Sequence, residues 1–155
     1  QNPTTTMEAL IPDFKGRLQD IQKIIDSAPE VVSHNMETVR RLTKNVRIQA
    51  KYDRSLDTLM HLCDGGIKTK SGVMLGLGET EKEIVETMHD LRAVGVSILT
   101  LGQYLQPSKK HLPVVEFINP VQFDKYREIG ISLGFQHVES SPLVRSSYHA
   151  EKHIH

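Results

Sequence analysis

The segment 70–80 constrains the fold of this chain more than any other, because it joins a strand, a glycine turn and a helix start. It begins as an apolar run of strand length, turns polar at Gly76, and places Glu79 directly before a helix. Thr80 followed by Glu83 forms a capping box, which marks the helix N-terminus. Such a turn offers free backbone N–H groups, a carboxylate and room for a ligand beside the main chain, which is the layout of a cofactor site. The alternative is an ordinary loop whose glycines only make the turn.

Strands and helices alternate along the whole chain. The predicted strands are 9–11, 31–37, the start of segment 70–80, 96–101 and 135–138, and the predicted helices are 17–28, 54–64, 80–94 and 119–134. A helical turn is expected at 38–42, and 46–50 is ambiguous between loop and strand. We expect segment 9–11 to be buried. This alternation predicts an α/β domain with a parallel sheet and right-handed crossovers.

Polar residues follow three of the predicted strands at the point where each strand ends. They are Asn35 and Glu37 after the second strand, Glu79 after the third, and Gln103 with Tyr104 after the fourth. The carboxyl ends of parallel strands meet at one edge of a sheet, where ligands of α/β proteins bind. The sequence therefore predicts a ligand site at this edge.

Composition limits the partners and the compartment. Nineteen acidic residues balance nineteen Lys and Arg, which argues against nucleic acid or an anionic membrane as an electrostatic partner. No apolar run is long enough to span a bilayer. The single Cys63 cannot form an internal disulfide, so we expect a reducing, cytoplasmic location, and its helical spacing from Leu59 predicts a core position. Because the chain opens at Gln1 and soon enters an apolar strand, we expect it to be part of a longer protein.

Five motifs resemble the lipoyl synthases, a family of radical S-adenosylmethionine enzymes, and the similarity covers essentially the whole chain. The motifs lie at 34–39, 52–56, 69–80, 102–108 and 145–150. Two of them also look like biotin synthase, but the closing Arg-Ser-Ser-Tyr is similar to lipoyl synthase. The resemblance implies a partial parallel (β/α) barrel over 1–142 with a tail over 143–155. It also implies insertion of two sulfurs into an octanoyl chain on a lipoyl carrier protein.

The resemblance also implies the residues that bind S-adenosylmethionine. They are Asn35, Glu37, Gly72, Gly76, Glu79, Gln103, Tyr104 and Leu105. The first two would hydrogen-bond the adenosyl ribose or nearby polar groups. The glycines and Glu79 match the family's Gly-x-Ile-x-Gly-x-x-Glu motif, with Met74 in place of isoleucine. The last three would line the adenine pocket, which agrees with the need of an adenine for an apolar wall and backbone donors.

Few residues of this chain match the ligands of the family's two four-iron four-sulfur clusters. The resemblance implies one cluster ligand at Ser147, with Ser146 as second choice, although both serines could simply cap or turn a tail. The family's two cysteine triplets have no counterpart here, and Cys63 does not match them. The resemblance places the grip on the methionine end of the cofactor outside this chain as well. We therefore expect a C-terminal part of a lipoyl synthase that is catalytically silent alone.

Three other interpretations remain open. The parent could be biotin synthase or another sulfur-inserting relative, or the piece could work alone as a non-catalytic adenosyl-binding or carrier-binding domain. His149 and His153 lie four residues apart and could bind zinc, but a solvated tail is the simpler expectation. Loss of the early strands of a barrel exposes a sheet edge, so we also expect the isolated chain to self-associate.

Overall fold

The protein was analysed as a computed structural model, which describes residues 7–145. It contains five strands, five α-helices and two short 3₁₀ helices. The strands are β1 (Glu8–Leu10), β2 (Val31–Ser33), β3 (Lys68–Leu75), β4 (Ile98–Gln103) and β5 (His137–Ser140). The helices are η1 (Phe14–Gly16), α1 (Leu18–Asp26), η2 (Arg40–Leu42), α2 (Thr43–Val46), α3 (Tyr52–Asp64), α4 (Glu81–Ala93) and α5 (Pro120–Ser132). The predicted alternation of strands and helices is confirmed.

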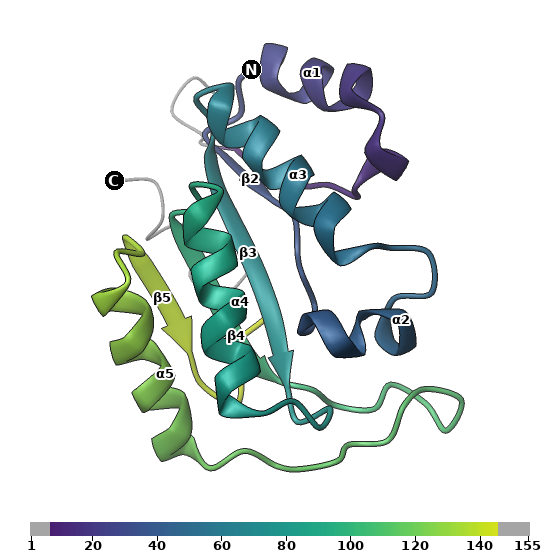
Figure 1. Ribbon diagram of the computed structural model, residues 1–155, viewed down its shortest axis with the longest axis vertical. Helices are drawn as coiled ribbons and strands as arrows, with labels where there is room; N and C mark the ends of the chain where they lie inside the picture. The colour runs from purple at the N-terminus through teal and green to yellow at the C-terminus, as the bar shows by residue number, and fades with distance from the viewer. Residues whose placement is uncertain (1–6, 146–155) are drawn as a thin grey trace.

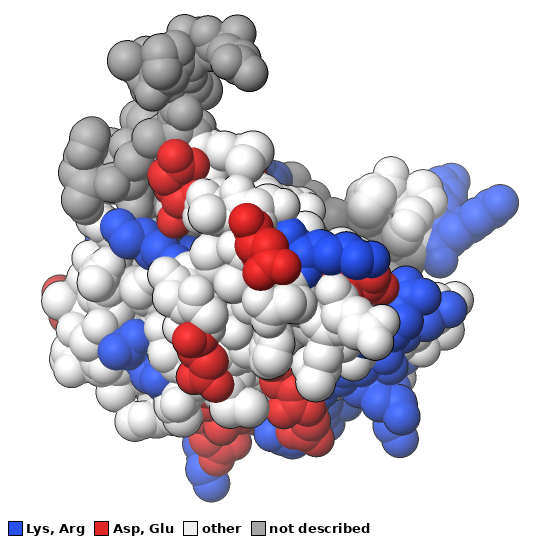
Figure 2. Space-filling view, turned by 90° about the horizontal axis from the view of Figure 1, so that it is seen from above, with Lys and Arg blue, Asp and Glu red and all other residues white. Residues whose placement is uncertain are grey.

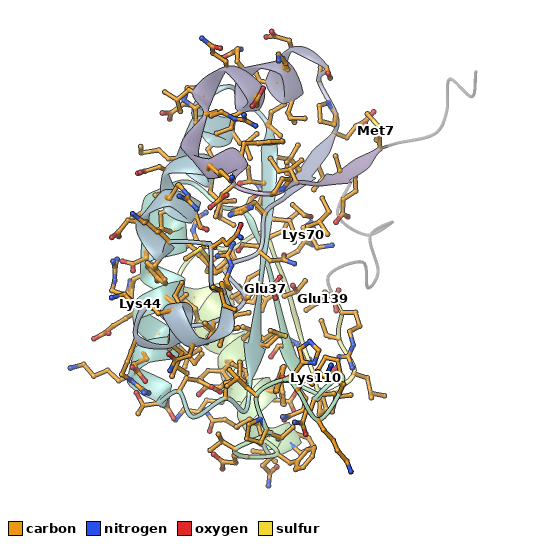
Figure 3. All side chains as sticks on the ribbon, turned by 90° about the vertical axis from the view of Figure 1, so that its right-hand side faces the viewer. Met7, Glu37, Lys44, Lys70, Lys110 and Glu139 are labelled. Atoms are coloured by element: carbon orange, nitrogen blue, oxygen red, sulfur yellow. The ribbon has the colours of Figure 1, made fainter. Side chains whose placement is uncertain are left out.

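The five strands form one parallel sheet in the order of the sequence, β1-β2-β3-β4-β5. In Figure 1 α3 and α4 lie in front of the strands and α5 lies beside β5, and the side view of Figure 3 places the helices on one side of the sheet. A sheet in this order, covered by helices on one face, is the arrangement of a (β/α) barrel that has not closed. The predicted α/β fold is confirmed.

The main core fills the space between the sheet and the helices. Alternate residues of a strand point to opposite faces, so Val73 and Leu75 on β3 face the helices together with Leu99 and Leu101 on β4. Ile84, Met88 and Leu91 of α4 are buried against them, as predicted. The same alternation leaves Lys70, Gly72 and Met74 on the opposite face. Figure 3 shows Lys70 and Glu139 on this side, away from the helices.

The predicted helix boundaries depend on local caps, and the structure confirms two of them. At α4, the Thr80 Oγ1 accepts a hydrogen bond from the Glu83 N–H, while the Glu83 carboxylate accepts one from the Thr80 N–H. At α5, the Asn119 side chain accepts from the Val121 N–H, and Pro120 occupies the first turn, where its missing N–H costs nothing. These caps fix where each helix leaves the rim of the sheet.

Several local expectations differ from the structure. The strand predicted at 31–37 ends at Ser33, and the strand predicted at 96–101 runs from Ile98 to Gln103, so Gln103 is its last residue. The strand predicted at 9–11 begins one residue earlier, and Leu10 is 63% exposed and not buried, because β1 is an edge strand whose alternate side chains face away from the helices. The ambiguous segment 46–50 forms no strand; α2 ends at Val46 and a loop leads to α3. Among the helices of residues 7–145, none has the length and apolar character that crossing a membrane requires.

Candidate functional site

A pocket of about 250 Å³ opens at the carboxyl ends of β2, β3 and β4. Five of the residues predicted from the sequence line it, namely Asn35, Glu37, Gly72, Gln103 and Leu105. They come from three separate segments of the chain and meet here because the strands that precede them are parallel neighbours. Gly76, Glu79 and Tyr104 do not line this pocket, although they belong to the turns that surround it.

The floor of the pocket depends on the absence of a side chain at Gly72. A Cβ at this position would lie 2.8 Å from the Thr100 Oγ1 and 3.0 Å from the Asn35 Oδ1. The Gly72 N–H donates a hydrogen bond to that same Asn35 Oδ1 over 3.1 Å, which fixes the orientation of the amide. The Asn35 side chain is therefore held by the backbone of β3, and any larger residue at 72 would displace it.

Glu37 joins β2 to β3 through its own backbone. Its N–H donates to the Gly72 carbonyl over 2.9 Å, and its carbonyl accepts from the Met74 N–H over 2.8 Å. Its φ of 65° lies in the left-handed region, which is uncommon for a residue other than glycine and is often found at functional sites. Burial raises the pKa of the Glu37 carboxyl, while Asn35 and Arg47 act in the opposite direction. A partly desolvated carboxylate beside a pocket is a strong hydrogen-bond acceptor for a ligand hydroxyl.

Glu79 does not offer its carboxylate to the pocket. Its Oε1 accepts a hydrogen bond from the Gly76 N–H over 2.6 Å, and its Oε2 accepts one from the Leu77 N–H over 2.9 Å. The expectation that this turn presents free N–H groups is therefore wrong at these two positions, because the carboxylate of the same turn already binds them. In this structure Glu79 shapes the turn between β3 and α4.

The second half of the rim is the segment 104–119, drawn in Figure 1 as a long loop below the sheet. The Gln103 side chain binds the main chain of this loop through two hydrogen bonds. Its Nε2 donates to the Glu116 carbonyl over 3.0 Å, and its Oε1 accepts from the Ile118 N–H over 2.9 Å. The Val115 N–H donates to the Gly76 carbonyl over 2.8 Å. Gly76 has a φ of 102°, and a Cβ there would overlap Gln103 and the Glu116 carbonyl. Gly76 and Gln103 thus position the loop.

Tyr104 and Leu105 continue from β4 into the loop and differ in exposure. The Tyr104 ring is buried, and its hydroxyl donates to the Leu112 carbonyl over 2.8 Å. Its N–H donates to the Leu75 carbonyl over 2.8 Å, which extends the pairing of β3 with β4. Leu105 is 50% exposed and supplies an apolar wall to the pocket.

Sequence reasoning did not assign to the site six residues that line the pocket, which are Val73, Met74, Thr100, Gly102, Val144 and Arg145. Thr100 could have been found, because it shares the face of β4 that carries Gly102. Val144 and Arg145 arrive from beyond β5, and no local pattern indicated their place. The absence of a side chain at Gly102 lets the main chain at Val144 approach β4, because a Cβ there would overlap the Val144 carbonyl. The Arg145 guanidinium donates to that carbonyl over 2.8 Å.

The described residues do not contain a metal centre. Within residues 7–145 no group of three or more His, Cys, Asp or Glu is placed to hold a metal ion. Cys63 is half-buried, its Sγ lies 3.0 Å from the Thr69 Oγ1, and burial raises the pKa of its thiol, which is the opposite of what a thiolate ligand needs. The predicted ligand Ser147, its alternative Ser146 and the histidines at 149 and 153 lie outside the described residues.

Comparisons with known proteins agree with the motifs. The family model described as the Radical SAM superfamily matches residues 2–91. The chain is 66% identical over 155 residues to the mitochondrial lipoyl synthase of Nematostella vectensis and 67% identical over 154 residues to the lipoyl synthase of Christiangramia forsetii. Each match covers 99% of this chain and 53% of the relative. The chain thus spans about half the length of these relatives.

Among solved structures, the chain is similar to the crystal structure of the HMG-CoA lyase from Brucella melitensis. The TM-score is 0.51 at 11% sequence identity, and the match covers 91% of this chain and 58% of the other. At this level of identity the likeness concerns the fold alone. It supports the α/β architecture seen in the sheet order.

Proposed function

This chain belongs to the radical SAM superfamily, and from that premise we propose that it is the C-terminal part of a lipoyl synthase. The reaction proposed for the whole enzyme is the S-adenosylmethionine-dependent insertion of two sulfurs into an octanoyl chain carried by a protein. The observation that supports this proposal best is the pocket at the ends of β2, β3 and β4, where residues of three separate family-like motifs converge. The identity with lipoyl synthases along the chain favours this family over biotin synthase.

The residues present fit an adenosyl group. Asn35 and Glu37 would hold the ribose hydroxyls, because an amide and a half-buried carboxylate together supply a donor and strong acceptors. Gly72 leaves the floor open, and Leu105 supplies an apolar wall for the adenine. Gly76, Glu79, Gln103 and Tyr104 would act by shaping the two turns at the rim. S-adenosylmethionine, when bound, supplies the reactive adenosyl group on which this superfamily's chemistry depends.

The residues of this chain do not fit an iron–sulfur cluster. A four-iron four-sulfur cluster is held by cysteine thiolates, and the single Cys63 is part of the packing between α3 and β3. A cluster therefore has to be held largely by residues outside this chain, and Ser147 is proposed as a ligand contributed by it. We expect the chain to be catalytically silent by itself for this reason.

The proposed protein partner is an octanoylated lipoyl carrier protein or lipoyl domain. This partner follows from the proposed reaction, because the octanoyl chain has to reach the adenosyl pocket while it is attached to its carrier. The loop 104–119 exposes Val115 and Phe117 and also carries the exposed Lys109 and Lys110, and such a mixture of apolar and basic side chains suits a protein surface that carries acidic residues.

The proposal can be tested by replacing the matching segment of the Christiangramia forsetii lipoyl synthase with this chain. The hybrid, loaded with iron and sulfide, should convert an octanoylated lipoyl domain to the lipoylated form, as followed by mass spectrometry. Gly72→Val should abolish conversion, because its side chain would fill the pocket floor, whereas Gly66→Ala, where the added Cβ meets nothing within 4 Å, should retain it. Conversion of dethiobiotin instead of the octanoyl domain would refute the proposal.

A further inference from the structure

The side chain of Arg41 joins two parts of the rim that are distant in sequence. Its Nε donates to the Glu83 Oε1 over 2.7 Å, and its Nη2 donates to the Glu83 Oε2 over 3.0 Å. The same Nη2 also donates to the main-chain carbonyl of Gly78 over 2.8 Å. Arg41 belongs to η2, whereas Gly78 lies in the turn between β3 and α4. One guanidinium thus connects η2 both to this turn and to the first turn of α4.

The main-chain contact distinguishes Arg41 from ordinary ion pairs at the surface. Figure 2 shows basic and acidic side chains next to one another over the visible face of the molecule, and exposed pairs of this kind contribute little stability. The neighbouring Arg40 makes only such side-chain contacts. It lies over the Tyr52 ring at 4.2 Å, and it pairs with Asp53 over 2.5 Å and with Asp90 over 3.6 Å. Arg40 therefore contacts α3 and α4, whereas Arg41 contacts the rim of the pocket.

Arg41 is carried by a rigid element and contacts a flexible one. Val39 and Leu42 flank it in sequence, and both are buried in the main core, which fixes the position of η2. The turn contains Gly76 and Gly78, whose φ values of 102° and 97° lie in the left-handed region that glycine adopts most readily. Glycine-rich main chain loses more conformational freedom than other main chain when it becomes ordered. The guanidinium therefore restrains a turn whose own sequence favours mobility.

The turn is connected to two residues that line the pocket. The Gly76 carbonyl accepts hydrogen bonds from the N–H groups of Val115 and Glu116 over 2.8 and 3.3 Å. The Gln103 side chain binds the same stretch of the loop through its own two hydrogen bonds. Gln103 and Leu105 line the pocket itself. A shift of the turn would therefore move the loop and, with it, the side of the pocket that these two residues form.

Resting on the proposed function, we propose that Arg41 is a positioning residue of the adenosyl pocket. Its guanidinium holds the turn 76–80, and through this turn the loop 104–119, in the arrangement that accepts the adenine. A rim that is ordered before binding loses less conformational entropy when the ligand arrives, so the affinity is higher. Arg41 itself does not line the pocket, and it acts through the main chain of the rim.

Two stable nucleosides measure this effect. Isothermal titration of the chain with methylthioadenosine reports the adenosyl affinity. Methylthioinosine, in which a carbonyl replaces the 6-amino group, reports how well the rim distinguishes the base. In the unaltered chain we expect methylthioadenosine to bind about 10-fold more tightly than methylthioinosine. Arg41→Gln should weaken methylthioadenosine about 10-fold and methylthioinosine about twofold, because the displaced rim no longer matches the base.

Arg40→Gln is the matched control. It removes the adjacent guanidinium, whose side chain has almost the same exposure, 56% against 55% for Arg41, and it leaves the contacts of the rim intact. This variant should bind both nucleosides within about twofold of the unaltered chain, and both variants should lower the melting temperature by similar, small amounts. Arg41→Lys keeps the charge but not the planar fork that reaches Glu83 and Gly78 together, so it should not restore the affinity.

Three results would overturn the inference. An equal loss of both nucleosides in Arg41→Gln would assign Arg41 a merely structural role, and full affinity in Arg41→Lys would indicate an effect of charge alone. Equal affinity of the unaltered chain for both nucleosides would overturn it as well, while leaving the adenosyl site intact. Binding of neither nucleoside by the unaltered chain would instead refute the proposed function itself.

Discussion

Gly76 should be among the positions least tolerant of substitution in the chain. In Gly76→Ala the backbone would keep a φ of 102°, which an L-residue rarely adopts and which costs about 1–2 kcal/mol. The new Cβ would also lie under 3.0 Å from Gln103 Nε2 and from the Glu116 carbonyl. Overpacking of this kind costs about 1–3 kcal/mol. The free energy of unfolding should therefore fall by about 2–5 kcal/mol.

Gly66→Ala provides the comparison that separates the two costs. Gly66 has a φ of 81°, but a Cβ there meets nothing within 4 Å, so only the backbone term of about 1–2 kcal/mol remains. Urea unfolding of both variants measures the difference, and hydrogen exchange of the loop 104–119 reports whether it detaches. If the two variants lost equal stability and the amides of the loop stayed protected from exchange in Gly76→Ala, the conclusion that Gly76 positions this loop would be refuted.

Three further outcomes are expected. Hydrogen bonds from Arg41 and Thr80 lower the pKa of Glu83 from 4.5 to about 2. At pH 6 the variant Glu83→Gln should therefore be less stable than the unaltered chain, and this difference should disappear as the pH falls from 4.5 toward 2. A melting-temperature difference between the two that stays constant over this range would contradict the prediction. Burial raises the pKa of Glu37, which penalises the ionised form, so Glu37→Gln should melt higher than the unaltered chain at pH 7 and equally at pH 4; a lower melting point at pH 7 would speak against this. Because β1 and β5 are the edge strands of the sheet formed by residues 7–145, light scattering should show association that grows with concentration, and a monomer at all concentrations would exclude it.

The order of strands and helices could be predicted because its signals are local. A capping box, an asparagine–proline pair and apolar periodicity each act within one or two turns of the chain, and the structure shows the helices α4 and α5 where these signals place them. The exposure of Leu10 was not predictable in the same way. It depends on which strand is at the edge of the sheet and on which face no helix covers, and both are properties of the assembled fold.

The candidate site was predictable to the extent that parallel strands bring their carboxyl ends together. Asn35, Glu37 and Gln103 could be placed at one rim from their predicted positions after strands, and they do line one pocket. What each polar group does there depends on partners distant in sequence. Gln103 meets the main chain 13 and 15 residues further on, and Arg145 arrives from beyond β5, so no spacing rule could have assigned them.

The hydrogen-bond partners of each polar residue separate those that build the pocket from those that can meet a ligand. Glu79 and Gln103 both belong to motifs that look like binding residues, yet their side chains are engaged by the main chain of the rim. Arg47 and Arg145, which the motifs did not single out for binding, line a neighbouring cavity and the pocket, respectively, without a carboxylate partner among residues 7–145. Substitutions in the first pair should therefore lower stability and ligand affinity together, because the rim itself changes shape. Substitutions in the second pair should lower stability less, because among the described residues these guanidinium groups donate to neutral acceptors, the Met36 carbonyl and the Ser55 Oγ for Arg47 and the Val144 carbonyl for Arg145.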